Sequence, residues 1–202
     1  VDMRLRPSGK AGLLVTRLET YAGYLQDDAW TWELQALVRA RAVFGQASLR
    51  SAFAQMRREQ LSRSRDALEL AKQVVSMREK MRSHKLTTTD GQAFDLKQGV
   101  GGITDIEFLV QFMVLRYAAD YPELTTWTDN VRILEQIAQL ELLPQAQAKE
   151  LIATYVRCRE WLHQLALDDR GNVTHQPVVK ERQVVTQAWQ HCFAAVIDDA
   201  AD

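Results

Sequence analysis

An alternation of apolar and charged side chains opens the sequence and would place three charges on one side of a strand. In residues 1–9 (VDMRLRPSG), Asp2, Arg4 and Arg6 alternate with apolar residues, and Pro7 begins the turn that ends the run. Strand side chains alternate between two faces, so one carboxylate and two guanidinium groups would project together. Carboxylate oxygens suit Mg²⁺ and guanidinium groups bind phosphate oxygens, which fits a metal-bound polyphosphate. By itself the strand pattern favours a simpler interpretation, a solvent-facing edge strand.

A second candidate site is the glycine-rich segment 97–108 (KQGVGGITDIEF), which contains Lys97, Asp105 and Glu107. A glycine-rich turn that leads into a helix presents free backbone amides, which can hold an anion. The segment lacks the order of a P-loop, and Asp105 would compete with a bound phosphate. The favoured alternative is that Asp105 stabilises the helix dipole while the glycines allow close packing. Glu107 and Gln111 lie one turn apart beside the apolar face, which predicts an interior polar contact or an interface.

Two tryptophans and two arginines form a third cluster. Trp30 and Trp32 precede Arg39 and Arg41, a combination that could stack on a ring and hold phosphate. Aromatic side chains at helical spacing are more often part of a core. We therefore predict that Trp30 and Trp32 are core residues that help to dock a sheet domain onto a helical body.

Composition limits the classes of partner. The 202 residues are 47% hydrophobic and carry a net charge of −1, so overall charge gives no reason to expect nucleic acid or a membrane as a partner. No apolar run is long enough to span a bilayer, and the N-terminus resembles no targeting peptide, so we expect a cytoplasmic location. Cys158 and Cys192 stand far apart within helical patterns, which predicts buried free thiols and not a disulfide or zinc site.

The elements that would position these residues are mainly helices. Apolar residues recur at helical spacing from residue 27 onward, which predicts a mainly α fold, a bundle of six to eight helices. Asp66 and either Thr128 or Asp129 are expected helix caps. Residues 87–97, with the turn Asp90–Gly91, predict a small β-hairpin. A boundary near Gly45 would separate residues 1–45, the end of a sheet domain, from an all-helical domain over 46–202.

Four motifs together resemble the bacterial glutamine synthetase adenylyltransferase family. They are residues 1–9 (VDMRLRPSG), 33–41 (ELQALVRAR), 97–108 (KQGVGGITDIEF) and 129–135 (DNVRILE). The resemblance covers almost the whole chain. The segment 29–33 (AWTWE) resembles the C-terminal, adenylylating half of that bifunctional enzyme and not the related PII uridylyltransferase.

The resemblance implies a fold and an activity. Residues 1–45 would be the terminal strand and helix of a truncated polymerase-β-like nucleotidyltransferase domain, whose GS motif and paired carboxylates are absent from this sequence. Asp2 would be the third catalytic carboxylate and a Mg²⁺ ligand, and Arg4 and Arg6 would bind the phosphates of ATP. The intact enzyme would transfer AMP to a tyrosine of glutamine synthetase, under control of the PII protein and of glutamine.

We expect this chain to be a fragment that is inactive when isolated. The alternative from another functional class is a non-catalytic helical module that binds glutamine synthetase or PII. Binding measurements are needed to distinguish these two, because the opening strand indicates nucleotide binding and the helical body indicates protein binding.

Overall fold

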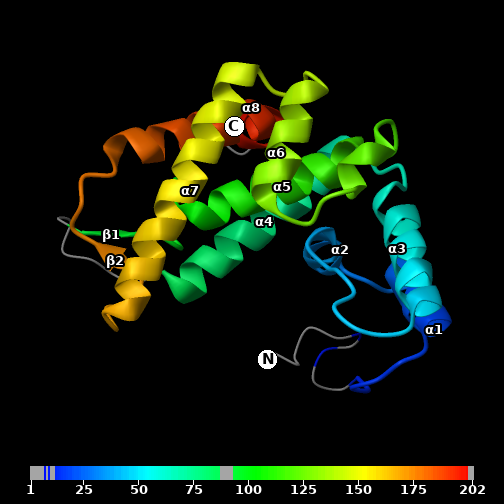
Figure 1. Ribbon diagram of the computed structural model, residues 1–202. Helices are drawn as coiled ribbons and strands as arrows, with labels where there is room; N and C mark the ends of the chain where they lie inside the picture. The colour runs from blue at the N-terminus through cyan, green and yellow to red at the C-terminus, as the bar shows by residue number, and fades with distance from the viewer. Residues whose placement is uncertain (1–6, 8, 10–11, 87–92, 200–202) are drawn as a thin grey trace. The chain divides into compact units, whose positions relative to one another are not determined.

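The computed structural model describes residue 7, residue 9 and residues 12–86 and 93–199. Over this part of the chain it forms eight α-helices, one short 3₁₀ helix and one pair of two-residue strands (Figure 1). The predicted mainly α fold is therefore confirmed, and six of the helices follow residue 46 as expected. None of the described helices combines the length and apolar character that a membrane span requires.

The chain divides into two compact units. Unit 1 comprises Val1–Arg65 and Val114–Thr128, and unit 2 comprises Asp66–Met113 and Asp129–Asp202. This division reflects which residues of the chain pack together. The predicted boundary near Gly45, which concerns a sheet domain beginning before the described residues, stays a prediction.

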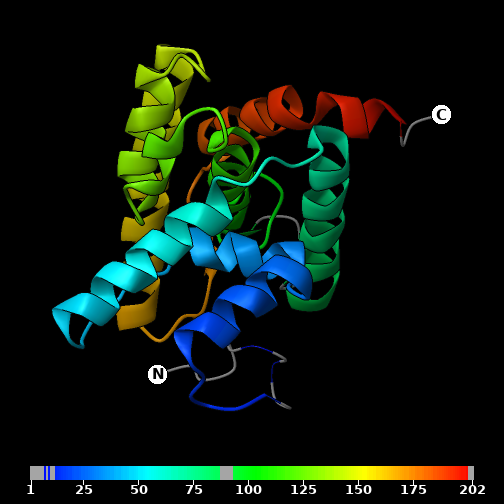
Figure 2. The same ribbon diagram turned by 90° about the vertical axis from the view of Figure 1, so that its right-hand side faces the viewer.

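Unit 1 is built from short helices that lie together in Figures 1 and 2: α1 (Leu18–Asp27), α2 (Thr31–Val38), α3 (Ala47–Leu61) and the 3₁₀ helix η2 (Pro122–Thr125). Their apolar side chains form its core, which includes Leu25, Leu37, Val38, Met56, Leu61 and Leu124. The helical spacing that begins at residue 27 does not start a helix there, because the chain leaves helical geometry between Asp28 and Trp30 and α2 ends at Val38.

A buried arginine joins three segments of unit 1. The Arg57 guanidinium on α3 donates hydrogen bonds to the carbonyl oxygens of Leu37 and Val38 at the end of α2, and of Thr125 at the end of η2. The last carbonyls of a helix lack partners within the helix and carry partial negative charge. Arg57 therefore serves as a shared cap, and burial lowers its pKa to about 10.

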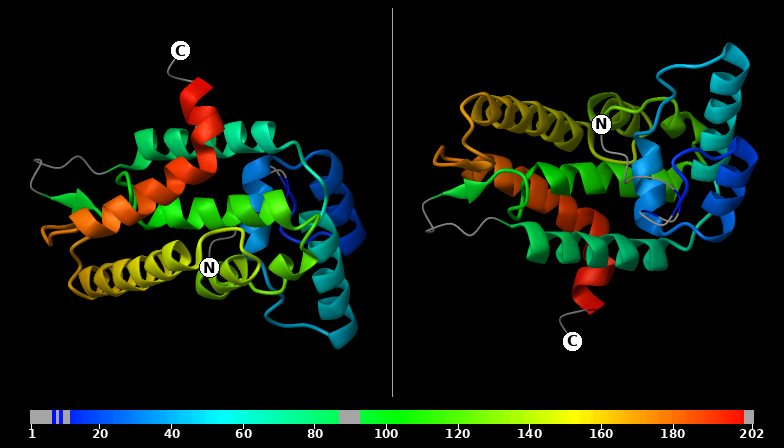
Figure 3. Two further views of the ribbon diagram at one scale, coloured as in Figure 1. Left: turned by 90° about the horizontal axis from the view of Figure 1, so that it is seen from above. Right: turned by 90° about the horizontal axis from the view of Figure 1, so that it is seen from below.

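Unit 2 is arranged around α5 (Ile103–Tyr117), which is buried on nearly all sides from Ile103 to Met113. Figure 3 shows α5 between α4 (Ala67–Lys85) and α7 (Gln145–Leu167) in both views. Helix α6 (Asn130–Gln139) packs on α7, and α8 (Val179–Asp199) packs against α4 and α7. A helix that is apolar around most of its circumference must be covered on every side, which explains its central place.

The predicted capping residues are confirmed where the sequence signal was a carboxylate. Asp66 accepts a hydrogen bond from the Glu69 amide at 2.7 Å, and Asp129 accepts one from the Arg132 amide at 3.0 Å. Each carboxylate satisfies an amide that has no partner within its helix. These two caps fix where α4 and α6 begin.

The described strand pair joins the end of the hairpin predicted over residues 87–97 to a distant segment, and the rest of that hairpin stays a prediction. Strand β1 (Phe94–Asp95) pairs antiparallel with β2 (Val173–Thr174), with Phe94 opposite Thr174 and Asp95 opposite Val173. The turn expected at Asp90–Gly91 lies outside the described residues. The alternation in the sequence identified a strand at Phe94, but its partner comes from the loop between α7 and α8 because a strand pattern does not encode which segment pairs with it.

Candidate functional site

The predicted phosphate face lies outside the described residues. Asp2, Arg4 and Arg6 are therefore not placed by the structure, and their roles stay predictions. The first described residue after them in the sequence is Pro7, which lines a pocket in unit 1. This pocket is the described feature closest in sequence to the predicted site.

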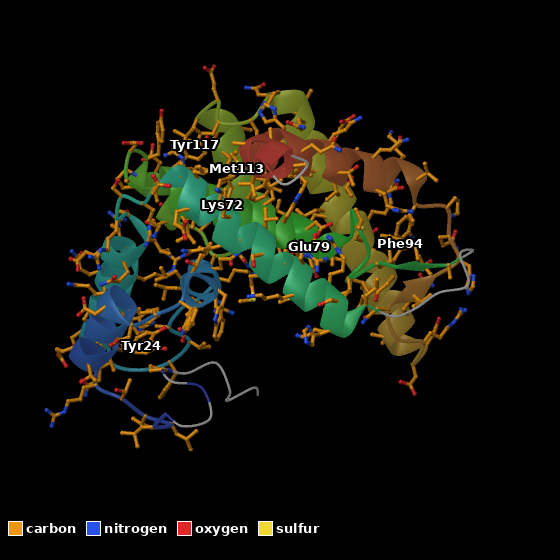
Figure 4. The ribbon with its side chains drawn as sticks, turned by 180° about the vertical axis from the view of Figure 1, so that it is seen from behind. Tyr24, Lys72, Glu79, Phe94, Met113 and Tyr117 are labelled. Carbon is orange, nitrogen blue, oxygen red and sulfur yellow. The ribbon has the colours of Figure 1, made fainter. Side chains whose placement is uncertain are left out.

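The pocket has a volume of about 340 Å³. Its walls are mainly apolar and come from Pro7, from α1 and from α2 with the residues just after it; they are Pro7, Tyr21, Leu25, Trp32, Glu33, Ala36, Leu37, Arg39 and Ala40. Figure 4 labels Tyr24, the neighbour of this wall on α1. A mainly apolar concavity with a few polar groups is typical of a small-molecule site.

Glu33 is the fixed acidic group of the pocket. The Tyr24 hydroxyl donates to the Glu33 carboxylate and lies 2.8 Å from Oε1 and 2.9 Å from Oε2. The Trp30 backbone amide also donates to Oε2, at 2.9 Å. The amide contact satisfies a donor at the start of α2, as a capping carboxylate does. Burial and the negative charge of Glu33 raise the pKa of Tyr21, so its hydroxyl remains protonated at neutral pH.

Within the described part of the chain Trp30 and Trp32 are not core residues, and their docking against a sheet domain stays a prediction. Trp30 is 71% exposed and Trp32 is 36% exposed. The Trp30 backbone amide donates to Glu33 at the start of α2, and Trp32 lines the pocket. Helical spacing predicts which residues share a face but not whether that face meets a neighbour, which is why the sequence misled here.

The glycine-rich segment in unit 2 surrounds a buried ion pair. Arg78 Nε of α4 donates to Asp105 Oδ1 at 2.6 Å, and the Gly101 amide donates to Oδ2 at 2.7 Å. Arg82 approaches the same carboxylate at 3.1 Å. Two guanidinium groups and a backbone amide therefore surround Asp105, which is 3% exposed.

Gln98 completes the buried polar group. Its side-chain and backbone oxygens each accept a hydrogen bond from Arg78 at 3.0 Å. Burial lowers the pKa of Arg78, and the charge and hydrogen bond of Asp105 act in the opposite direction. Figure 4 labels Glu79, which forms an exposed ion pair with Arg82, and Phe94 on β1.

The glycines of this segment occupy positions where a side chain would not fit. A Cβ on Gly99 would lie 2.4 Å from the Phe94 ring, and a Cβ on Gly101, whose φ is +83°, would lie 2.8 Å from the Arg182 carbonyl oxygen. The amides that follow point inward as well: Gly102 donates to Gly99 and Ile103 donates to Leu96. These contacts support the interpretation that the turn allows close packing, since these amides are already used.

The other two predicted residues of this segment are less buried than Asp105. Lys97 is exposed, and Glu107 is half-buried on α5, as is Gln111 one turn later. That Lys97, Asp105 and Glu107 belong to a binding site or an interface stays a prediction. The sequence had singled out Asp105, but it gave no sign of Arg78, which is 27 residues away along the chain.

Both cysteines are free, as predicted. Cys158 is buried and Cys192 is half-buried. Burial raises the pKa of each thiol to about 11. Across the described residues, no three histidine, cysteine, aspartate or glutamate side chains are grouped so as to hold a metal ion.

Comparison with known proteins supplies the family. Residues 1–56 match the family model described as glutamate-ammonia ligase adenylyltransferase, and residues 75–191 match the model described as GlnD PII-uridylyltransferase. The first match includes the whole α1–α2 pocket wall, and the second includes most of the helices of unit 2. Different parts of this chain are thus similar to two nucleotidyltransferase families.

Curated relatives match along nearly the entire chain. The bifunctional glutamine synthetase adenylyltransferase/adenylyl-removing enzyme of Idiomarina loihiensis is 52% identical over 191 residues, and that of Shewanella frigidimarina is 50% identical over 195 residues. These matches cover 95% and 96% of this chain but only 20% of each relative, so the chain spans about a fifth of their length. Along nearly its whole length the chain is similar to glutamine synthetase adenylyltransferases, and it belongs to the domain family described as GlnD PII-uridylyltransferase, whose model matches more than half of the chain.

Proposed function

We propose that this chain is part of an enzyme that transfers AMP from ATP to a tyrosine of glutamine synthetase. The observation that carries the proposal is the identity of about half the residues, along nearly the whole chain, to enzymes named for that activity. In the reaction, the tyrosine hydroxyl oxygen bonds to the α-phosphorus, its proton is lost, and the bond to pyrophosphate breaks. AMP remains on the target protein.

The residues of the opening strand would position the nucleotide. Asp2 would supply one oxygen ligand to Mg²⁺, while Arg4 and Arg6 would hold phosphate oxygens through charge-assisted hydrogen bonds. When bound, Mg²⁺ would reduce the repulsion between the triphosphate and an incoming oxygen. Catalysis of this kind depends on positioning and charge stabilisation, so one carboxylate is insufficient and further ligands would come from other parts of the enzyme.

The direct test is Asp2→Asn in the intact enzyme. This substitution keeps the shape of the side chain and removes its charge, so we expect AMP incorporation into glutamine synthetase to fall by at least about a hundredfold. Asp28→Asn is the matched control, because Asp28 is an exposed aspartate at the end of α1. Near-normal incorporation by Asp2→Asn would remove Asp2 from the metal site.

Adenylyl transfer is preferred to uridylyl transfer because the curated relatives are named for the former. The match of residues 75–191 to the PII-uridylyltransferase model makes the comparison worth an experiment. Competition between ATP and UTP in the intact enzyme distinguishes the two. Preferential incorporation of UMP would overturn the assignment.

That same match favours a second role for unit 2. Residues 75–191 lie entirely outside the segment that matches the adenylyltransferase model, so the helices of unit 2 would serve regulation or protein binding. PII, glutamine and glutamine synthetase itself are the proposed partners. Titration of this chain with Mg-ATP, glutamine synthetase and PII tests this role: binding to a protein but not to Mg-ATP supports it.

The cytoplasmic location stays a prediction.

A further inference from the structure

The unit 1 pocket lies next to the predicted phosphate-binding residues along the chain. Pro7, which lines the pocket, is covalently joined to Arg6, the last of the charged residues on the opening strand. Because the proposed phosphate-binding residues directly precede Pro7 in the sequence, a nucleotide is the class of ligand that we consider for this pocket.

The wall of the pocket suits a flat ring. Trp32 and Ala36 lie one turn apart on α2, and both line the cavity. Ala36 contributes only a methyl group to this lining, and the Trp32 side chain is partly exposed. Aromatic rings stack on one another in offset arrangements, and base–aromatic stacking is a common way to hold a nucleobase. The volume of about 340 Å³ lies within the range of small-molecule pockets.

The polar edge of the pocket suits a hydrogen-bond donor. Tyr24 and the Trp30 amide hold the Glu33 carboxylate in place, and a carboxylate accepts several hydrogen bonds at once. Adenine presents an exocyclic amino group, which is a donor, and the ribose presents hydroxyl groups. Uracil lacks an exocyclic amino group, and its single N3–H donor lies between two carbonyl oxygens that would face the carboxylate unfavourably.

We propose that this pocket binds the adenine base of the nucleotide, with the ring against Trp32 and its amino group directed to Glu33. The inference rests on the proposed nucleotidyl transfer and deepens it, since it assigns the choice of base to α2.

The test compares two ligands that share the phosphates and differ in the base. Dissociation constants of Mg-ATP and Mg-tripolyphosphate are measured on the intact enzyme, for the natural protein and for Ala36→Leu, which fills the pocket. We expect Ala36→Leu to weaken Mg-ATP binding by about tenfold or more and to leave tripolyphosphate binding within about twofold. Ala54→Leu is the matched control, because Ala54 is also an exposed helical alanine but lies on α3 away from the pocket lining.

Trp32 variants provide an independent second measurement. Trp32→Phe keeps a flat ring and should retain most of the affinity for Mg-ATP, whereas Trp32→Ala should lose it while tripolyphosphate still binds. Unchanged Mg-ATP affinity in both Ala36→Leu and Trp32→Ala would overturn the pocket assignment and leave the proposed function standing. An equal loss of both ligands would also overturn it, because the base alone would not be affected. If the natural enzyme binds neither ligand, the proposed function itself fails.

Discussion

Arg78 and Asp105 form a buried ion pair that joins α4 to the start of α5, with Nε and Oδ1 2.6 Å apart. The Arg78 side chain is fully buried and the Asp105 side chain is only 4% exposed. The Gly101 amide and Gln98 satisfy the remaining polar atoms that face this pair. A buried pair of this kind is tolerated because its hydrogen bonds are met on both sides.

Removal of one member of this pair should destabilise the chain strongly. Asp105→Ala leaves the Arg78 charge buried without its main partner, so we expect the free energy of unfolding to fall by about 3–5 kcal/mol. Urea unfolding followed by circular dichroism measures it. Glu79→Gln breaks an exposed ion pair on the same helix and should cost less than about 1 kcal/mol. Equal effects of the two substitutions would contradict the structural role of Asp105.

Arg57 should be needed as a cap in unit 1. Arg57→Met keeps much of the side-chain volume but leaves the carbonyl oxygens of Leu37 and Thr125 without this donor. Since an unsatisfied buried polar group costs about 1–3 kcal/mol, we expect a loss of at least about 2 kcal/mol in the free energy of unfolding. The neighbouring Arg58 is exposed, and Arg58→Met should change stability by less than about 0.5 kcal/mol. A neutral Arg57→Met would show that the carbonyls find other donors.

Alanine substitution of glycines should have opposite effects in the two units. Gly99→Ala places a Cβ 2.4 Å from the Phe94 ring and 2.6 Å from the Asp95 carbonyl oxygen, so we expect a loss of about 2 kcal/mol or more. Gly23 lies within α1 with nothing within 4 Å of a Cβ, and Gly23→Ala should stabilise by about 0.5–1 kcal/mol. Thermal unfolding of both variants provides the measurement. Gly99→Ala with unchanged stability would mean that the turn is loosely packed.

The buried thiols should make stability depend on alkaline pH. Their pKa is about 11 in the folded chain against an ordinary value of 9.0, so from pH 9 to 11 the unfolded chain loses these protons first. The folded state then binds more protons than the unfolded state, and the free energy of unfolding falls as pH rises through this window.

The matched comparison is the double variant Cys158→Ala with Cys192→Ala. Between pH 9 and 11 the natural chain should lose about 2 kcal/mol or more relative to this variant, because one pKa unit corresponds to about 1.4 kcal/mol. Urea unfolding at several pH values isolates the difference, since all other titrating groups are common to both. Parallel pH profiles for the two proteins would show that the thiols are not desolvated.

The sequence by itself determined the helical class, the cap at Asp66, a cap at either Thr128 or Asp129, the start of α5 after the glycine-rich turn, and the resemblance to the adenylyltransferases. These depend on local signals: apolar spacing along one segment, a carboxylate that reaches an amide three residues later, and motifs read in order. The sequence also predicted that Asp105 lies in the first turn of a helix, where its charge stabilises the helix dipole.

Only the tertiary structure decided which distant groups meet. Among the described residues β1 pairs with β2, Arg78 forms an ion pair with Asp105, and Arg57 closes the ends of α2 and η2. Trp32 became a wall of a pocket instead of core because burial depends on what covers a helix face. Contacts between segments far apart in sequence follow from packing the whole chain, and no local pattern specifies them.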